Sequence, residues 1–576
     1  MRHAPIAFLG LLVFTWLGFK FYPGHSYLRG ATQLYVPILE RLASPGYLSR
    51  DLVATHPNVT YTVYDEATLF LRQALRVDFA AALGAQQILF RFAWAAGVFL
   101  IARATGLNRL WSVVLSASVS LGAVLPGCST ALLDPEPVPR AFSLGLTFFA
   151  LGFIADEKPL LAGLAAGTGL IYDARVAAPF WIILLLAFAL DRRLRYLVRP
   201  SLPILTVFAL LLANLAQLQP GAAENQQLLE RITPYAAMIQ QTRTPWVWVS
   251  QWAPEEIWHY LAILIIGLLA SSQIWPKLNR QMRWMFICLP VAGVLSVPLS
   301  YVLLERMRWA IIPQIEPAKS LAFTVAICVI ACGLAGLMAA RRARVWEAVA
   351  WFALVFLVQI DVRILDALRL TNVSSLSKLA IALLLGGAFA LIAAKSASGP
   401  WQCSALLIPC VAMLVLPFAP RFHAGDDPQT RQTPAALSEV AAWAANNTWA
   451  GSVFAFPDAA KSTQPSVFRA SAQRALWVDW ESGAQILYTP SLTEIWWARW
   501  QEMMEPPFSP SHLQSLLSLP VDYYVLRRLD ALAAGEDHHY SGIPAVFSNE
   551  EFVVYEAEEL RNAPGKLRFA AERPGG

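Results

Sequence analysis

The chain has 576 residues, of which 57% are hydrophobic and only 14% are charged, and its mean hydropathy is +0.48. Soluble globular proteins carry about 25% charged residues, so this composition excludes an ordinary soluble globular protein, a disordered chain and a coiled coil, and it indicates a membrane protein. The net charge of +5 lies in short loops between apolar runs and does not indicate a nucleic acid partner. Six cysteines are too few for a disulfide framework in so long a chain.

Thirteen apolar runs are predicted to be transmembrane helices, which need about 20 mostly apolar residues, or somewhat fewer when buried among others. The first has no small-residue cleavage site behind it and is predicted to be an uncleaved signal anchor. The fifth and sixth are short and separated only by the segment from Asp173 to Arg175. In chain order the runs cover residues 5–21, 79–102, 110–126, 139–155, 159–172, 176–190, 197–218, 257–275, 284–304, 318–338, 346–361, 376–395 and 403–419.

Basic residues follow every second predicted span, which is typical of cytoplasmic loops. If the N-terminus is cytoplasmic, the inner segments hold 15 basic and 3 acidic residues. The part after residue 420 is then extracytoplasmic and has 12 basic and 19 acidic residues. The basic inner residues are Arg2, Arg103, Arg109, Lys158, Arg192, Arg193, Arg195, Arg199, Lys277, Arg280, Arg283, Arg341, Arg342, Arg344 and Lys395.

Two regions outside the membrane are large enough to be structured, so the chain divides into a transmembrane domain, 1–420, and an extracytoplasmic α/β domain, 421–576. The first loop, 22–78, is predicted to form interfacial helices, and 219–256 to form an interfacial lid. In the C-terminal domain a helix pattern precedes β-like stretches at 452–456, 476–480, 521–526 and 552–556. Its tryptophans are predicted to form a core, with a glycan or partner surface as the alternative; they are Trp477, Trp480, Trp496, Trp497 and Trp500.

Ionisable residues at membrane depth are costly and are therefore candidate functional residues. Arg91 lies in the middle of the second predicted span, either at a site or in a hydrogen bond between helices. The outer loops add acids and arginines near the membrane surface, which suit a phosphate donor beside a base or a metal. The alternative is that these loop charges are solvated and paired with one another. They are Asp51, Asp65, Asp134, Glu136, Arg140, Asp173 and Arg175.

Other catalytic signatures are absent from the sequence. There is no Walker loop, no Gly-x-Gly-x-x-Gly before a helix and no Gly-x-Ser-x-Gly elbow, which disfavours an ATP-driven transporter and a lipase. The histidines lack the spacing of a structural zinc site.

The predicted architecture resembles the GT-C superfamily of integral-membrane glycosyltransferases, which use polyprenyl-phosphate-linked sugars. Thirteen spans, a long first outer loop with acids and an outer C-terminal domain are similar to that layout. Closer motifs, similar to those of uncharacterised bacterial GT-C-like proteins, are Tyr35-Val36-Pro37-Ile38-Leu39-Glu40-Arg41, Ser44-Pro45 and Asp51 in the first loop, and Phe468-Arg469-Ala470-Ser471 and Val478-Asp479-Trp480 in the outer domain.

The resemblance implies an enzyme of the bacterial inner membrane that moves a sugar from such a donor to a glycan, lipid or protein acceptor. Asp51 is then the first candidate for the base, with Asp134 and Asp65 as the other acids, and Arg140, Arg175 and Arg91 as ligands of the donor phosphate. The resemblance does not decide whether a cofactor is needed: some members of the superfamily use a divalent metal, Mg²⁺ or Mn²⁺, and others use none. The family's usual acid just after the first span is missing, since no acid occurs between residues 22 and 39. A non-catalytic GT-C-like scaffold and a transporter or flippase are the alternative functions.

Overall fold

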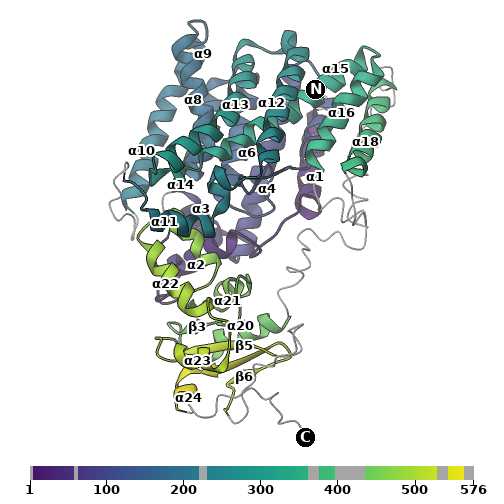
Figure 1. The fold of residues 1–576 in the computed structure, drawn as a ribbon. Coiled ribbons are helices and arrows are strands. Elements are labelled where there is room, and N and C mark those ends of the chain that lie inside the picture. Colours follow the sequence, from purple (N-terminus) through teal and green to yellow (C-terminus); the bar gives the residue numbers. More distant parts are fainter. Residues whose placement is uncertain are drawn as a thin grey trace.

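The computed structural model describes residues 4–57, 62–218, 230–360, 375–395, 435–528 and 543–562. A bundle of apolar helices occupies one end of the molecule and an α/β domain the other (Figure 1). Each of the first twelve predicted runs contains a helix; the thirteenth, 403–419, lies outside the described residues. The helices are α1 (Ala4–Lys20), α4 (Phe79–Ala104), α5 (Arg109–Ser118), α6 (Pro139–Ala155), α7 (Pro159–Tyr172), α8 (Ala174–Leu190), α10 (Leu202–Leu218), α12 (Pro254–Ile274), α13 (Arg280–Ser300), α15 (Leu321–Arg341), α16 (Val345–Gln359) and α18 (Ser375–Lys395).

Length and composition support the membrane assignment. Among the described residues, five helical segments are long and apolar enough to cross a membrane, and shorter apolar helices pack beside them. The five are Phe79–Ala104, Pro254–Lys277, Arg280–Arg306, Ile311–Arg341 and Ser375–Lys395. The fourth of these includes α15, which is buried almost throughout at the centre of the bundle.

Glycines set the close packing of α4 against α6. A Cβ on Gly97 would lie 2.2 Å from the carbonyl oxygen of Phe148, and one on Gly145 would lie 2.3 Å from that of Phe90. Only glycine fits at such distances, and small residues at helix interfaces are the usual way in which membrane helices approach each other. This contact holds the middle of α6 against the middle of α4.

The prediction of a continuous helix over 110–126 is wrong. Helix α5 ends at Ser118, and a short hairpin of β1 (Val124–Leu125) and β2 (Thr130–Ala131) follows. The buried Gln359 side chain replaces the missing helical hydrogen bonds: its Nε2 donates to the Ser118 carbonyl at 2.9 Å, and its Oε1 accepts from the Leu121 amide at 3.2 Å. Irregular backbone of this kind is tolerated within a membrane domain where protein surrounds it.

Short helices connect the bundle to the C-terminal domain. The first loop contains α2 (Thr32–Ala43) and α3 (Tyr64–Leu75), as predicted, and the segment before α12 contains α11 (Pro234–Arg243). These helices lie between the bundle and the C-terminal domain (Figure 1). Helix α2 contacts α21 (Gln464–Ala472), and α11 contacts α22 (Leu492–Met504).

The C-terminal domain is built on a five-stranded mixed sheet of order β4-β3-β5-β7-β6. Strand β3 (Val453–Ala455) is parallel to β4 (Ala475–Leu476) and β5 (Tyr523–Arg527), and β5 is antiparallel to β7 (Phe552–Glu556). These strands overlap the four predicted stretches, whereas the edge strand β6 (Phe547–Ser548) was not predicted. The flanking helices are α20 (Ala435–Asn447), α21, α22, α23 (Pro510–Leu516) and α24 (Ala557–Arg561).

The five tryptophans from Trp477 to Trp500 belong to the core of this domain or pack against it. Trp496, Trp497 and Trp500 are buried in one apolar cluster, and Trp477 and Trp480 pack against it. The prediction of core packing is therefore confirmed over that of an exposed glycan surface.

Candidate active site

The first charged pair lies in the segment that leads into α6. Arg140 donates from Nε and Nη2 to one oxygen of Asp134, Oδ2, at 3.0 and 2.7 Å. The other oxygen, Oδ1, accepts from the Glu136 amide at 3.1 Å. The Glu136 carboxylate in turn accepts from the Arg29, Gly30 and Thr32 amides just before and at the start of α2. Asp134 and Glu136 thus hold this proline-rich segment in one conformation.

The second pair lies between α7 and α8. Asp173 begins α8 by accepting from the Arg175 amide, and the two side chains form a fork with distances of 2.9 and 2.6 Å. Burial alone would raise the pKa of Asp173, but the Arg175 guanidinium outweighs it, so the pKa is lowered and the carboxylate stays ionised. Arg175 Nη1 also donates to Glu316 Oε2 at 3.0 Å and to the Tyr488 hydroxyl at 2.9 Å.

The third pair, Glu316 and Lys319, was not among the predicted site residues. Glu316 joins α14 (Ile311–Ile315) to the short helix Pro317–Ser320 in the left-handed conformation, with φ 45°. Such a conformation costs a non-glycine residue about 1–2 kcal/mol, and strain of this kind is concentrated at functional sites. The Lys319 ammonium forms an ion pair with the same Oε2 that receives Arg175.

These six residues form one group, here named the charge cluster: Asp134, Arg140, Asp173, Arg175, Glu316 and Lys319. The buried Tyr35 of α2 lies within electrostatic range of Arg140, Asp173, Arg175 and Tyr488, and Arg140 lies within range of Glu316. Three carboxylates balance three cations. Two small pockets adjoin the cluster, one beside Asp134 between α4 and α6, the other beside Glu316 and Lys319.

Arg91 lines the small pocket beside Asp134 and is held there by backbone groups. Its guanidinium donates to three backbone carbonyls, those of Gly18 at 2.9 Å, Gly24 at 2.6 Å and Asp134 at 2.9 Å. Gln87, one turn away on α4, donates to the same Asp134 carbonyl at 3.1 Å. Arg91 thus ties the end of α1 and the turn after it to the peptide of the candidate acid.

Asp51 lies against the C-terminal domain. Its Oδ1 accepts from the Val53 and Ala54 amides, and its Oδ2 accepts from the Leu476 amide of β4 at 3.0 Å. Arg469 lies 3.9 Å from Oδ2 and donates to Asp479 at 2.9 Å. The two motifs of the outer domain that carried the family resemblance therefore meet Asp51 at the junction of the first loop and the domain. Burial raises the pKa of Asp51, and its hydrogen bonds to the Leu476 amide and to its own loop are those of a docking residue.

Asp65 lies in the first turn of α3 with only 3% of its surface exposed. Burial and the hydrogen bond with its neighbour Glu66 raise the pKa of Asp65 to about 9. Because this carboxyl is protonated at neutral pH, it is unsuited to accept a proton there.

The raised pKa of Asp65 predicts a pH-dependent stability. An unfolded aspartate has a pKa of about 3.9, so between about pH 4 and pH 9 the folded protein binds one more proton here than the unfolded chain. Stability from this group is therefore greatest below pH 4 and is lost as the pH rises to 9. We expect the stability advantage of the wild type over Asp65→Asn to fall by about 1.4 kcal/mol per pH unit in this window. Melting temperatures of both proteins at pH 5, 7 and 9 in one detergent measure it, and parallel curves would contradict it.

The described residues offer no metal site. Within them, no group of three or more His, Cys, Asp or Glu side chains lies close enough together to hold a metal ion. The carboxylates of the charge cluster are occupied instead by arginine and lysine. The described residues therefore do not fit a bound divalent metal.

Comparison with known proteins gives a match in fold. No protein-family model matches the sequence, and no curated protein matches it. The apo-state crystal structure of ArnT from Cupriavidus metallidurans aligns with a TM-score of 0.51 at 11% identity, covering 96% of this chain and 97% of ArnT. ArnT bound to undecaprenyl phosphate aligns with a TM-score of 0.49 at 12% identity over the same fractions. Arabinofuranosyltransferase AftD from Mycobacteria aligns at 0.42 and 14% identity, covering 96% of this chain and 40% of AftD.

The match to apo ArnT, a GT-C glycosyltransferase, extends over nearly the whole of both chains and includes the bundle and the C-terminal domain. At such low identity it concerns the fold and no individual residue. Together with the apolar helices, it confirms the resemblance predicted from the sequence: the chain is a membrane protein with a GT-C-like fold.

Proposed function

We propose that this protein is a membrane glycosyltransferase that takes a sugar from a polyprenyl-phosphate-linked donor. The observation that carries the proposal is the charge cluster, whose three cations come from three separate helix entrances. Arg175 and Lys319 meet at Glu316, and Arg140 lies within electrostatic range of the same carboxylate. Tyr35 of α2 lies near Arg140 and Arg175, and Tyr488 of the C-terminal domain accepts from Arg175. Arginine forks bind phosphate by paired hydrogen bonds, and lysine adds a compact charge. The GT-C-like fold and the existence of a solved ArnT complex with undecaprenyl phosphate support the choice of ligand.

In the proposed site, Arg140, Arg175 and Lys319 bind the donor phosphate. Each is already held by a carboxylate, so its position is fixed before the ligand arrives and little ordering is needed on binding. A phosphate added to this balanced group brings excess negative charge, which favours release of one carboxylate from its cation. Developing negative charge on the leaving phosphate is stabilised by the same cations.

Asp134 is the proposed base. As the acceptor oxygen attacks the anomeric carbon, the bond from that carbon to the phosphate oxygen breaks, polyprenyl phosphate leaves, and Asp134 receives the acceptor proton. Asp134 lines one of the two small pockets and is held through Arg140. Asp173 suits this role less well, because its lowered pKa makes it a weaker base. Asp51, the first candidate from the sequence, lies outside the charge cluster, where the amide of Leu476 binds it to β4 of the C-terminal domain.

The proposed location is the plasma membrane of a bacterium, with the N-terminus cytoplasmic and the C-terminal domain outside. The alternation of basic loops supports this orientation. The N-terminus and the short helix α9 (Arg195–Val198), in the most basic loop, both lie at the end of the bundle opposite the C-terminal domain (Figure 1). A glycan, lipid or protein acceptor would approach from the outer side, where Tyr488 of the C-terminal domain reaches Arg175.

Binding of undecaprenyl phosphate by the purified full chain tests the proposal. Undecaprenol, which has the same chain and no phosphate, is the matched control. We expect at least about tenfold tighter binding of the phosphate, equivalent to about 1.4 kcal/mol, by native mass spectrometry. Equal binding of both lipids would overturn the phosphate site. Movement of the carrier across vesicles without sugar transfer from any polyprenyl-phosphate sugar would favour the transporter alternative.

A further inference from the structure

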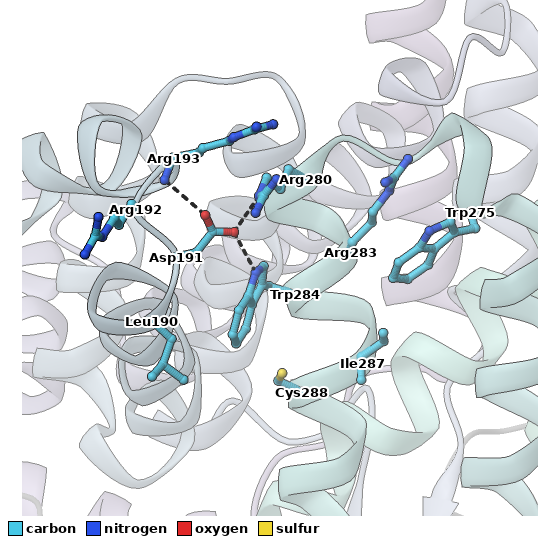
Figure 2. A pocket seen from close by; sticks show the side chains of 10 residues that line it. All are labelled: Leu190, Asp191, Arg192, Arg193, Trp275, Arg280, Arg283, Trp284, Ile287 and Cys288. Carbon is cyan, nitrogen blue, oxygen red and sulfur yellow. Dashed lines mark hydrogen bonds and ion pairs between the residues drawn. The ribbon is translucent and has the colours of Figure 1, made fainter.

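A third pocket, of about 640 Å³, lies between the end of α8 and the start of α13. It is near α9, at the end of the bundle opposite the C-terminal domain (Figure 1), and shares no residue with the charge cluster. Figure 2 shows arginines on one side of it and apolar side chains on the other. Its lining consists of Leu190, Asp191, Arg192, Arg193, Trp275, Arg280, Arg283, Trp284, Ile287 and Cys288.

The pocket has an excess of positive charge. Asp191 is the acidic residue in its lining, and its buried carboxylate accepts from Arg280 Nε, from Trp284 Nε1 at 3.2 Å and from the Arg193 amide at 3.0 Å (Figure 2). The Arg280 guanidinium beside it lowers the pKa of Asp191, so the carboxylate remains charged and neutralises that arginine. Three arginines are then left without a carboxylate among the lining residues.

These three arginines present their charge to the pocket and its surroundings. Arg192 and Arg193 are exposed, and no ion pair of their side chains occurs among the described residues. Arg283 donates to the Leu278 carbonyl at 3.1 Å and lies over the Trp275 ring at 5.0 Å, which fixes its guanidinium at the rim. An anion is the ligand that complements this side of the pocket.

The other side of the pocket is apolar and open. Leu190, the last residue of α8, is 69% exposed, and Ile287 of α13 is 38% exposed. Seven residues of helix separate Arg280 from Ile287, or about 10 Å along the axis, a distance comparable to that from a lipid headgroup to its acyl chains. Trp275 and Trp284 lie between the two levels, as tryptophans do at membrane interfaces.

We propose that this pocket binds an anionic phospholipid, with its phosphate among the arginines and its acyl chains along Leu190 and Ile287. A soluble phosphate compound would gain nothing from the exposed apolar side, whereas a lipid covers it. The proposal is independent of the function proposed for the charge cluster, since the two sites lie at opposite ends of the bundle.

The test compares phosphatidylglycerol with phosphatidylcholine on the full chain in detergent, by native mass spectrometry. The variant is Arg192→Gln with Arg193→Gln, and the control is Arg341→Gln with Arg342→Gln, which removes two exposed charges at the end of α15. We expect wild type to prefer phosphatidylglycerol. We expect the variant to bind it about 10- to 30-fold more weakly, since each arginine near an anionic lipid contributes about 1 kcal/mol. The control should bind it as wild type does.

Three results would overturn the proposal. They are equal binding of the two lipids by wild type, equal loss in the variant and the control, and binding of soluble glycerol 3-phosphate as tight as that of phosphatidylglycerol. Ile287→Asn gives a further check, because it should weaken phosphatidylglycerol binding while retaining every arginine. Melting temperatures of all variants show whether a loss reflects unfolding.

Discussion

Replacing Arg175 with alanine is expected to lower sugar transfer from a polyprenyl-phosphate donor by about 10²- to 10³-fold, the usual effect of removing one donor to a developing oxyanion. This guanidinium is the centre of the charge cluster. It forms a fork with Asp173, donates to Glu316 and reaches Tyr488 of the C-terminal domain. Its loss removes a proposed ligand of the phosphate and the residue that joins two of the three charged pairs.

Arg175→Lys separates charge from geometry. Lysine keeps the charge but cannot form the fork with Asp173 and reach Glu316 at the same time, so we expect most of the loss to remain. Arg76→Gln is the control, since Arg76 is exposed at the end of α3 and lies outside the cluster. Binding of undecaprenyl phosphate and the melting temperature are measured on the same samples. A folded Arg175→Ala protein that binds the carrier as wild type does would contradict the assignment.

Tyr488→Phe examines the link to the C-terminal domain within the same series. It removes one hydroxyl acceptor of Arg175 and leaves the ring against which the guanidinium lies, 5.6 Å from its centroid. We expect a change well below that of Arg175→Ala, because Asp173 and Glu316 still hold the arginine. If Tyr488→Phe lowers sugar transfer as much as Arg175→Ala does, closure by the domain, and not the arginine itself, limits the reaction.

The charged pairs show how far the sequence predicts the site. Asp134 with Arg140 and Asp173 with Arg175 were identified because each precedes or begins an apolar run on the predicted outer side. Glu316-Pro317-Ala318-Lys319 follows the same pattern, an acid and then a base at the start of a run, and applying that criterion throughout would have found it. That the three pairs come together depends on how α2, α6, α8 and α15 pack, which local sequence does not determine.

Asp51 shows the opposite case. Its place after the Ser44-Pro45 motif made it the first candidate for the base, yet its carboxylate binds the amide of Leu476, a residue 425 positions away in the chain. Such long-range pairing has no local signal. The break after Ser118 was missed for a similar reason, because Gln359 of a distant helix supplies the hydrogen bonds that stabilise it.

The sequence allows two roles for Arg91, a ligand at the site or a hydrogen-bond donor that holds the helices together, and the two roles predict different results. If Arg91 holds the backbone, Arg91→Met leaves the carbonyls of Gly18, Gly24 and Asp134 buried without this donor. Hydrogen bonds to a charged group contribute about 1.5–3 kcal/mol each and are not additive, so we expect a loss of about 4 kcal/mol in the free energy of unfolding. Gln87→Leu removes neutral hydrogen bonds to the Asp134 and Pro135 carbonyls and to the His25 ring, and is expected to cost about 2 kcal/mol, less than Arg91→Met.

Stability and carrier binding must therefore be measured together on Arg91→Met. Because Arg91 acts on the Asp134 peptide, a backbone role predicts a large fall in stability and only an indirect effect on undecaprenyl phosphate binding. That effect should be reproduced in part by Gln87→Leu, which disturbs the same peptide without removing a charge. If Arg91→Met keeps its stability but loses carrier binding, Arg91 is instead a ligand of the phosphate. A residue that acts only by holding backbone would lower the stability when it is replaced, because its three carbonyl contacts would be lost.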